Sequence, residues 1–323
     1  MHGNEQTAQR WARHLSPAYR VRITREWTGG AEQLMIALHA RRSAASMAAW
    51  GAALPRRPLL LVLTGTDLYR DIDGDAQAQA SLALADALVV LNELGLARLP
   101  PALRPRGQVI LQSCSEWQTL PKTNRRLRAL MVGHLREEKD PATYLRAARR
   151  LAGRHDIRLD HIGAVLDPAL GALAAERAAA QSNYRWMGAL PHASVRRRIQ
   201  AAHLLVHASR MEGGAHVVME ALRSGTPVLA SRIDGNVGLL GPAYGGYFDC
   251  GDDVALAALL ERARDDPAML PALRAQASQR SALFAPVVER ASLLALVSSL
   301  MPAHPSPNPI GAPRWMPPPP NPG

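Results

Sequence analysis

Residues 212–220 read EGGAHVVME and are followed at once by ALRSGTPVLA at residues 221–230. Two carboxylates, Glu212 and Glu220, are therefore separated by seven residues. On one ideal helix, eight residues correspond to about 800° of rotation and about 12 Å of rise, so the two side chains could not bind the same small group. The spacing predicts that they contact different parts of one long ligand.

The local sequence around the two glutamates indicates a loop that leads into a helix. Gly213 and Gly214 favour a loop at Glu212, whereas residues 215–223 are mostly helix formers and place Glu220 about a turn and a half inside a helix. Amide groups at the beginning of such a helix attract phosphate, and a carboxylate deeper inside can accept hydrogen bonds from vicinal hydroxyl groups. The alternative interpretation is that both glutamates are solvated charges on a helix surface.

Two apolar runs flank this segment, at residues 204–208 and 227–230. Their length and aliphatic content predict buried strands of a parallel sheet. Ligands of such sheets bind at the carboxyl ends of the strands, which is where the loop of Glu212 begins. The flanks therefore favour a binding role over a solvated surface.

Apolar runs alternate with helical segments along the whole chain, which is typical of α/β units around parallel sheets. The predicted strands form two sets: residues 19–25, 33–38, 59–63, 87–91 and 108–112, and residues 129–133, 159–164, 184–187, 204–208 and 228–231. Residues 115–126 are polar and contain a proline, which predicts a linker. We therefore expect two domains, at residues 1–118 and 127–285.

The two ends of the chain differ in character. Residues 286–301 predict an apolar helix that braces the domains from outside, and the proline-rich residues 302–323 predict a disordered tail. At the other end, Gly3 and Asn4 lead directly into the helical stretch 5–15. A doubly wound domain normally opens with a strand that delivers such a loop to the ligand cleft, so we expect the first strand to be missing through a truncated or misassigned start.

Composition limits the class of protein. The chain has 323 residues with 47% hydrophobic and 4% aromatic content, contains no run long enough to span a membrane, and begins with no visible signal peptide, so we expect a cytoplasmic protein. Its formal net charge is +11, with 36 arginines and 2 lysines spread over most predicted helices and no nucleic-acid-binding motif. The charge predicts favourable steering of small anions rather than a nucleic-acid partner. The oligomeric state is left open.

No metal site is predicted from the cysteines and histidines. Cys114 and Cys250 are far apart and are expected to be buried free thiols. His203 and His207 are four residues apart, but on a strand this spacing separates them by about 13 Å.

With these segments in place, the chain resembles the retaining glycosyltransferases of family 4, which have the GT-B architecture: two Rossmann-like α/β domains with parallel sheets that face a cleft. The resemblance extends to about residue 300 and is most specific at residues 212–241. Residues 132–141, VGHLREEKDP, are similar to the first strand and loop of the family's donor domain. The resemblance implies that Arg136 and Lys139 hold the diphosphate; the alternative is that they are ordinary surface charges.

The same resemblance implies the remaining donor residues. It places Glu212 near the sugar as a catalytic group and Glu220 on the ribose. The other donor-binding residues that it implies are Gly213, Gly214, Asp234, Gly235, Asn236 and His134. The chain departs from many family members at Gly238, where they carry a glutamate, and this departure counts against ordinary sugar-acceptor chemistry.

Three further segments are similar to the selenosugar synthases of selenoneine biosynthesis: LHARRS at 38–43, LTGTDLYRD at 63–71 and SRIDGNVG at 231–238. This resemblance implies transfer of N-acetylglucosamine from UDP-N-acetylglucosamine to selenophosphate, with release of UDP and with no cofactor. The identity of the base and the sugar comes from the resemblance alone. The alternatives are an ordinary family 4 transferase with a hydroxyl acceptor and a non-catalytic nucleotide-sugar-binding subunit.

The acceptor is expected to face the donor from the first domain. The residues assigned to it are His39, Arg41, Arg42, Asp67, Gly3 and Asn4. Arginine suits a small anion because its planar fork forms paired hydrogen bonds with phosphate oxygens. Adjacent residues seldom point the same way, so only one of Arg41 and Arg42 is expected to bind; the alternative is that both belong to the general arginine excess.

Overall fold

The computed structural model describes residues 3–301 and contains two parallel sheets. The N-terminal sheet has the order β1-β2-β3-β4 and is built from β1 (Met35–Leu38), β2 (Leu59–Leu63), β3 (Ala87–Val90) and β4 (Gly107–Val109). Its four strands coincide in position with four of the predicted runs. The fifth prediction, residues 19–25, is wrong: this segment is an irregular, mostly exposed coil, in which Ile23 is 52% exposed. Alternating apolar residues do not form a strand without a neighbouring strand edge to pair with.

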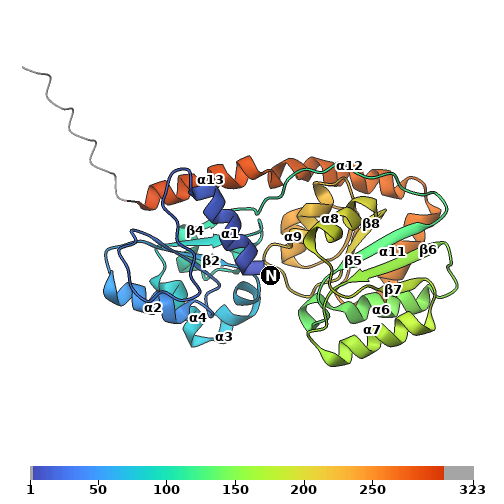
Figure 1. Cartoon of the computed structure of the whole chain (residues 1–323), viewed down its shortest axis with the longest axis horizontal. Helices are drawn as coiled ribbons and strands as arrows, with labels where there is room; N and C mark the ends of the chain where they lie inside the picture. The colour runs from blue at the N-terminus through green and yellow to red at the C-terminus, as the bar shows by residue number, and fades with distance from the viewer. Residues whose placement is uncertain (1–2, 302–323) are drawn as a thin grey trace, which may run out of the picture.

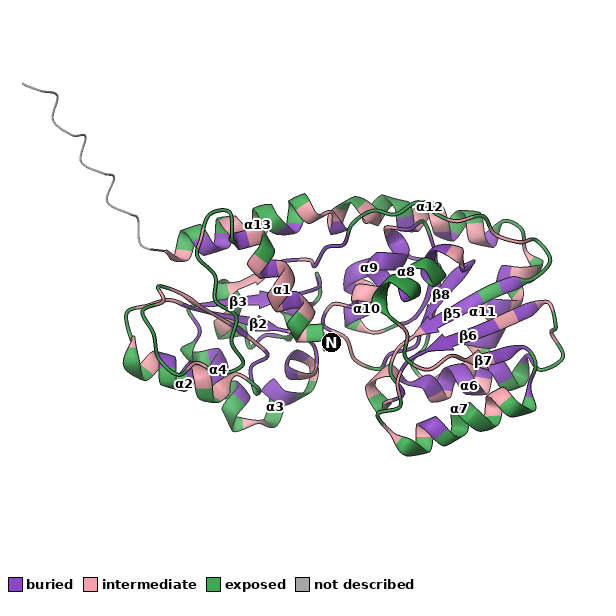
Figure 2. Cartoon of the chain, viewed as in Figure 1, coloured by how far each residue is buried: buried purple, intermediate pink, exposed green. Residues whose placement is uncertain are grey.

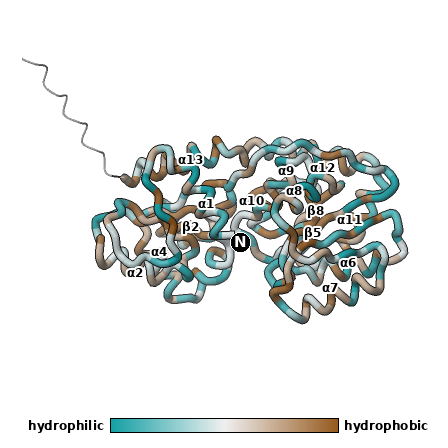
Figure 3. Tube along the Cα trace, viewed as in Figure 1, coloured by the Kyte–Doolittle hydropathy of each residue, from teal (hydrophilic) through white to brown (hydrophobic). Residues whose placement is uncertain are grey.

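Alternation along β2 explains how the N-terminal sheet is covered on both faces. Leu59, Leu61 and Leu63 face the core formed with α2 (Ala44–Ala53) and α4 (Ala76–Leu84). Leu60 and Val62 belong to a second core, formed with α1 (Gly3–Leu15) and α13 (Pro286–Leu300). Because successive side chains of a strand point to opposite faces, a continuous apolar run is needed here. Figure 3 shows β2 as a hydrophobic segment of the N-terminal domain. Shorter helices complete the unit: α3 (Ile72–Gly74) and α5 (Gly95–Arg98), with a π-helical turn at Asp67–Asp71 and a 3₁₀ turn at Pro101–Arg106.

The C-terminal sheet has six parallel strands in the order β10-β9-β8-β5-β6-β7. Its strands are β5 (Leu127–Val132), β6 (Ile157–Ile162), β7 (Tyr184–Trp186), β8 (Leu204–His207), β9 (Val228–Ser231) and β10 (Tyr247–Phe248). The first five coincide with predicted strands, whereas the two-residue β10 was not predicted because it is too short to give a pattern. The helices are α6 (Pro141–Arg150), α7 (Pro168–Ala180), α8 (His192–Ala201), α9 (His216–Leu222), α10 (Asp234–Leu240), α11 (Asp253–Asp265) and α12 (Met269–Ser281). Figure 2 shows buried strands within a shell of helices whose outer sides are exposed.

Two segments connect the domains. Residues 115–126 contain no helix or strand and lie on the C-terminal domain, where Trp117 N–H donates to Arg223 O at 3.0 Å and Leu120 N–H donates to Gln200 O at 3.2 Å. The chain returns through α12 and α13, which run along one side of both domains in Figure 1. Helix α13 lies within residues 286–301, for which an apolar helix is predicted, and it packs against α1 of the N-terminal domain.

A buried carboxylate fixes α13 in place. Glu289 accepts hydrogen bonds from Trp11 Nε1 at 2.7 Å, from Arg10 Nε at 2.9 Å and from the Ser113 backbone N–H at 2.9 Å. The side chain is 1% exposed. One residue thus joins α13 to α1 and to the segment that follows β4.

The predictions for the two cysteines, the C-terminal tail and a membrane span have different outcomes. Cys114 is buried, and burial raises its pKa to about 12, but Cys250 is exposed, so the prediction of a buried thiol is wrong there. The predicted disordered tail, residues 302–323, lies outside the described residues. Across residues 3–301, no single helix has both the length and the apolar content to cross a membrane; one bent pair, Met269–Phe284 with Pro286–Leu300, satisfies these criteria only when both helices are taken together.

Candidate active site

The strand order of the C-terminal sheet reverses between β5 and β8. From β5 the chain proceeds outward through β6 and β7, then returns so that β8 pairs with the other edge of β5. Beyond the carboxyl ends of two such strands the connecting loops diverge and leave a crevice that binds ligands. Lys139 lies in the loop after β5 and Glu212 in the loop after β8. The fold therefore places Lys139 and Glu212, which were predicted from separate motifs, next to each other.

Glu212 and Lys139 form a direct ion pair between Oε1 and Nζ. His207, the last residue of β8, lies on the other side, with Nε2 3.4 Å from Glu212 Oε1. Burial by itself would raise the pKa of Glu212, but the charge of Lys139 and the hydrogen bond with His207 outweigh it and hold that pKa well below its usual range. The Glu212 carboxylate is therefore ionised, and Lys139 is its counter-ion.

Glu220 lies in α9, within a second cluster. Its Oε1 is 2.6 Å from His192 Nε2, 3.5 Å from His216 Nδ1 and 3.7 Å from Arg196 Nε. Burial would again raise the pKa, but hydrogen bonds with His192 and His216 lower the pKa of Glu220 to about 2. The predicted helix thus exists, and its glutamate is a buried anion with cationic groups around it.

We expect a pH-dependent readout at this second cluster. The hydrogen bond with Glu220 raises the pKa of His192 above 6.5. The His192–Glu220 interaction therefore stabilises the fold fully below pH 6.5 and is lost as the pH rises through the raised value. An NMR titration of the ring should give a pKa above 6.5 in the wild type and a lower one in Glu220→Gln. His155→Gln, on an exposed loop, is the control and should leave the pKa of His192 unchanged. Equal His192 pKa values in the wild type and in Glu220→Gln would contradict the pairing.

A crevice of about 300 Å³ lies where the two domains face each other. Tyr69 and Arg98 line it from the N-terminal domain, and Glu212, Asp234 and Gly235 line it from the C-terminal domain. Arg210 and Met211 complete the loop that carries Glu212. Residues predicted for the donor site therefore share one crevice with residues of the other domain.

The glycines of this region are explained by close approach of backbones. A Cβ at Gly213 would lie 2.5 Å from the Thr64 carbonyl carbon, and one at Gly214 would lie 2.9 Å from Leu91 Cβ. Asn92 Nδ2 donates to Gly213 O at 2.8 Å across the same contact. A Cβ at Gly235 would lie 2.0 Å from the Glu212 carbonyl oxygen, so this glycine lets the beginning of α10 approach the Glu212 loop. Gly213 and Gly214 thus let the Glu212 loop pack against the N-terminal domain.

Three predicted donor residues have individual placements. Arg136 is partly exposed, with Nε 3.8 Å from Glu138 Oε2. His134 Nδ1 accepts a hydrogen bond from Ala164 N at 3.1 Å, which joins the loops after β5 and β6. Asn236 is fully buried and donates to Ser231 O at 2.9 Å. Asn236 is therefore held in the interior and is not a lining residue of the crevice.

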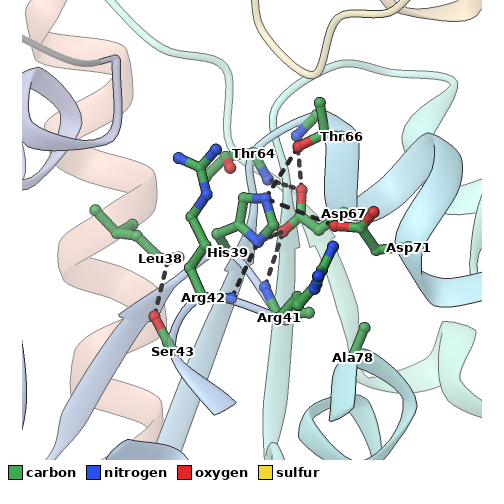
Figure 4. Close-up of polar contacts among 12 residues, drawn as sticks. Leu38, His39, Arg41, Arg42, Ser43, Thr64, Thr66, Asp67, Asp71 and Ala78 are labelled. Carbon is green, nitrogen blue, oxygen red and sulfur yellow. Dashed lines mark hydrogen bonds and ion pairs between the residues drawn. The ribbon is translucent and has the colours of Figure 1, made fainter. Parts of the chain in front are cut away.

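The predicted acceptor residues His39 and Asp67 lie together at the carboxyl ends of β1 and β2 (Figure 4). Asp67 is fully buried and accepts hydrogen bonds from the backbone N–H groups of Ala40, Thr64 and Gly65 at 3.0, 2.9 and 2.8 Å. Its oxygens are thus committed to positioning the two loops. His39 is also buried, and its Nε2 is 2.9 Å from Thr66 Oγ1.

The charge state of His39 follows from its surroundings. Burial lowers the pKa of His39, against the opposing charge of Asp67. The ring is therefore neutral at pH 7. Its backbone has φ = 80°, a left-handed conformation that a non-glycine residue rarely adopts, and Arg42 N–H points to its Nδ1 at 3.4 Å. The strained residue turns the chain so that Arg41 and Arg42 follow directly at the edge of the sheet.

The four remaining acceptor predictions differ in their surroundings. Arg41 Nε lies 3.2 Å from Asp75 Oδ2, whereas the guanidinium of Arg42 forms no ion pair with any carboxylate between residues 3 and 301. Gly3 and Asn4 form the beginning of α1, and Gly3 O accepts a hydrogen bond from Thr7 Oγ1 at 3.1 Å. Neither Gly3 nor Asn4 lines the crevice.

Several residues of these clusters were missed from the sequence. The sequence pattern tests His207 only as a metal ligand, although its place at the end of a predicted strand also makes it a candidate for the site. His192 and Arg196 gave no local signal, because only the tertiary fold brings them to the Glu220 cluster. Tyr69 lies in the quoted segment 63–71 but was given no role. Among the described residues, no group of three histidine, cysteine or carboxylate side chains could hold a metal ion.

Comparison with known proteins gives a family and a fold. Residues 116–281 match the family of glycosyl transferases group 1. HepE from Anabaena, solved with UDP and glucose, aligns at 16% identity over 83% of this chain and 78% of its own, with a TM-score of 0.68. Sucrose-phosphate synthase from Thermosynechococcus elongatus aligns at 21% identity over 83% and 73%, with a TM-score of 0.67. TarM from S. aureus aligns at 12% identity over 83% and 55%, with a TM-score of 0.65.

No curated protein sequence matches the chain. The structural neighbours are GT-B glycosyltransferases, and their two-domain arrangement confirms the predicted fold class. The matched segment covers half of the chain and contains Lys139, Glu212 and Glu220. The chain belongs to the family of glycosyl transferases group 1 and has the GT-B fold.

Proposed function

We propose that this transferase moves N-acetylglucosamine from UDP-N-acetylglucosamine to selenophosphate, and that it does so in the crevice between the domains. Membership of the family supports transfer of a sugar from a nucleotide sugar. The observation that carries the location is the convergence of Lys139 and Glu212 at the reversal of strand order. The donor sugar and the acceptor rest on the sequence resemblance to selenosugar synthases.

The donor roles follow from charge. Glu220 would accept hydrogen bonds from the ribose hydroxyl groups after exchange of its contact with His192. Lys139 and Arg136 would stabilise the charge that develops on the departing diphosphate, since fixed positive charge lowers the barrier to loss of an anionic group. Glu212 would hold Lys139 in place and lie near the sugar. Asp234 and Gly235 would line the sugar, whereas Gly213, Gly214 and Asn236 would shape the loops around it.

The bond changes are few. The selenium of selenophosphate attacks the anomeric carbon, a carbon–selenium bond forms, and the carbon–oxygen bond to UDP breaks with its electron pair leaving on UDP. The selenium is already anionic, so no strong general base is required. Positioning and electrostatic stabilisation would supply most of the rate enhancement.

The acceptor anion would meet the N-terminal domain at the loops after β1 and β2. Arg42 is the better candidate of the two adjacent arginines, because Arg41 is engaged by Asp75. His39 and Asp67 would position this loop rather than contact the anion, since both are buried among local partners.

We expect Arg42→Ala to raise the apparent KM for selenophosphate about tenfold or more at fixed donor concentration, because it removes a charged hydrogen-bond donor. Arg41→Ala is the matched control and should change that KM by less than about threefold. Steady-state kinetics with both variants give the answer, and calorimetric UDP affinity should be the same in both. Equal, wild-type KM values would remove the acceptor from this loop.

The reaction itself is tested by incubating the protein with UDP-N-acetylglucosamine and selenophosphate. Mass spectrometry should detect a sugar product with the isotope pattern of selenium, together with UDP. Parallel reactions with hydroxyl acceptors test the ordinary transferase alternative. UDP release only with hydroxyl acceptors would overturn the selenophosphate assignment, and UDP binding without any turnover would support a non-catalytic subunit.

A further inference from the structure

A second cavity, of about 260 Å³, lies behind α9. Its walls come from the linker, from the end of α9 with the turn that follows it, and from α12. It shares no lining residue with the crevice between the domains. The two segments that connect the domains, residues 115–126 and α12, therefore both border this cavity.

Two arginines dominate the charge of this cavity. Arg223 has a side chain that is 10% exposed, and Arg274 is partly buried. The Nε atom of each is shielded from solvent and has no hydrogen-bond partner among residues 3–301. A buried donor without an acceptor costs free energy, so both guanidinium groups gain if an acceptor enters beside them.

Only weak opposing charge is present. Glu116 is the one carboxylate among the lining residues; its Oε2 is 3.3 Å from Arg223 Nη2, and its side chain is 75% exposed. Such an exposed pair contributes little and is easily displaced. Nearby, burial together with the charge of Arg274 lowers the pKa of Lys122 to about 8. The cavity is thus bordered by more cationic than anionic groups.

The helix end at this cavity does not repel an anion strongly. The carbonyl groups that end α9 already accept hydrogen bonds: Met219 O from Arg223 N–H and Ala221 O from Thr226 N–H, each at 2.9 Å. Helix α9 has only seven residues. The negative end of its dipole is therefore small beside two full positive charges.

We propose that the cavity behind α9 binds a small phosphate-bearing anion, no larger than a sugar phosphate, between Arg223 and Arg274. Two planar guanidinium forks suit the oxygens of a phosphate group. The hydroxyl groups of Thr119 and Ser278, which also line the cavity, add neutral donors. The volume lies just below the usual range for ligand pockets, about 300–1,000 Å³, and therefore favours a small anion over a nucleotide.

The site is connected to the Glu220 cluster by short contacts. Arg223 follows α9, and Ser224 Oγ donates to Glu220 O at 2.7 Å. Arg196 stacks on the linker residue Trp117, with its guanidinium carbon 4.3 Å from the ring centroid, and its Nε is 3.7 Å from Glu220 Oε1. An anion that holds the linker against α9 and α12 would therefore change donor affinity. This coupling, unlike the binding itself, rests on the proposed function.

Binding is tested by calorimetric titration with inorganic phosphate at constant ionic strength, in the presence of saturating UDP so that the diphosphate subsite is filled. Arg274→Gln and Arg223→Gln should each weaken phosphate binding about tenfold or more, since each removes a charged donor. Arg149→Gln, an exposed arginine of α6, is the matched control and should bind phosphate as the wild type does. Circular dichroism establishes that the variants are folded.

The binding site would be overturned by wild-type phosphate affinity in both Arg274→Gln and Arg223→Gln, or by loss of phosphate binding in Arg42→Ala while the two cavity variants retain it. The second result would place phosphate at the acceptor loop. Absence of phosphate binding by the wild type would also overturn it.

The coupling is tested by measuring the UDP dissociation constant with and without phosphate. We expect phosphate to change the UDP dissociation constant of the wild type by about fivefold or more and to leave that of Arg274→Gln unchanged. An unchanged UDP affinity in the phosphate-bound wild type would overturn the coupling. Failure of the wild type to bind UDP would instead contradict the proposed function. The cavity can then still be tested by thermal unfolding with phosphate alone, since a ligand that binds the folded protein stabilises it.

Discussion

Lys139→Ala should lower the rate of UDP release about 100- to 1,000-fold, the usual cost of removing one fixed donor from a developing negative charge. Lys139 has a second role in this chain, because it is also the counter-ion of Glu212, whose side chain is only 12% exposed. Without Lys139, the Glu212 carboxylate would have His207 as its one remaining ion-pair partner among residues 3–301. The effect should appear mainly in kcat, since the charge on the leaving group grows in the transition state.

Two companion variants separate this effect from misfolding. Lys139→Arg retains the positive charge and should restore part of the rate, whereas Arg149→Ala, on the exposed side of α6, should stay within about twofold of the wild type. A folded Lys139→Ala protein with the wild-type turnover would show that the diphosphate is held elsewhere.

Glu289→Ala should lower the free energy of unfolding by about 3–5 kcal/mol, because removal of one partner leaves a buried network of donors without its acceptor. The partners come from three segments: α1 through Arg10 and Trp11, the chain after β4 through Ser113, and α13 through Glu289 itself. Urea unfolding followed by circular dichroism measures the loss. Glu261→Ala, which removes a half-exposed side chain of α11 whose one ion pair, with Arg154, is long at 3.7 Å, should change the same quantity by less than about 0.5 kcal/mol.

The pH dependence of stability gives a second readout of Glu289. Burial by itself would raise its pKa, but the hydrogen bond with His14 and the charge of Arg10 lower it to about 2, from an ordinary value of 4.5. A lowered carboxyl pKa contributes stability above pH 4.5 that is lost as the pH falls toward 2. Glu289→Gln should show a shallower decline over this window. If Glu289→Ala unfolded at the same urea concentration as Glu261→Ala, α13 would be held by its apolar contacts alone.

The fold was largely predictable because its strands are continuous aliphatic runs. Residues 59–63 are buried on both faces of the N-terminal sheet, so their period-free apolar pattern identifies a strand without any knowledge of its neighbours. The failures have the opposite cause. Residues 19–25 alternate like a strand but find no strand edge to pair with, and β10 has two residues, too few to produce a pattern.

Part of the candidate site could be predicted from one rule, namely that parallel sheets bind ligands at the carboxyl ends of their strands. This rule pointed to the loops of Glu212 and His39, and it could have pointed to His207, whereas the loop of Lys139 was predicted from the family resemblance of residues 132–141. The rule could not show that Asp67 and Asn236 turn inward, since their partners are backbone groups that only the folded loops supply. Nor could it reveal His192, which meets Glu220 across two helices.

The central claim is that the donor nucleotide binds in the C-terminal domain with Glu220 on its ribose. Calorimetric titration of UDP into the wild type, Glu220→Ala and the control Glu261→Ala tests this claim most directly. Loss of a charged hydrogen-bond acceptor typically costs about 1.5–3 kcal/mol, so UDP should bind to Glu220→Ala roughly ten- to a hundredfold more weakly than to the other two proteins. Equal UDP affinity in all three, or no UDP binding by the wild type, would contradict the account.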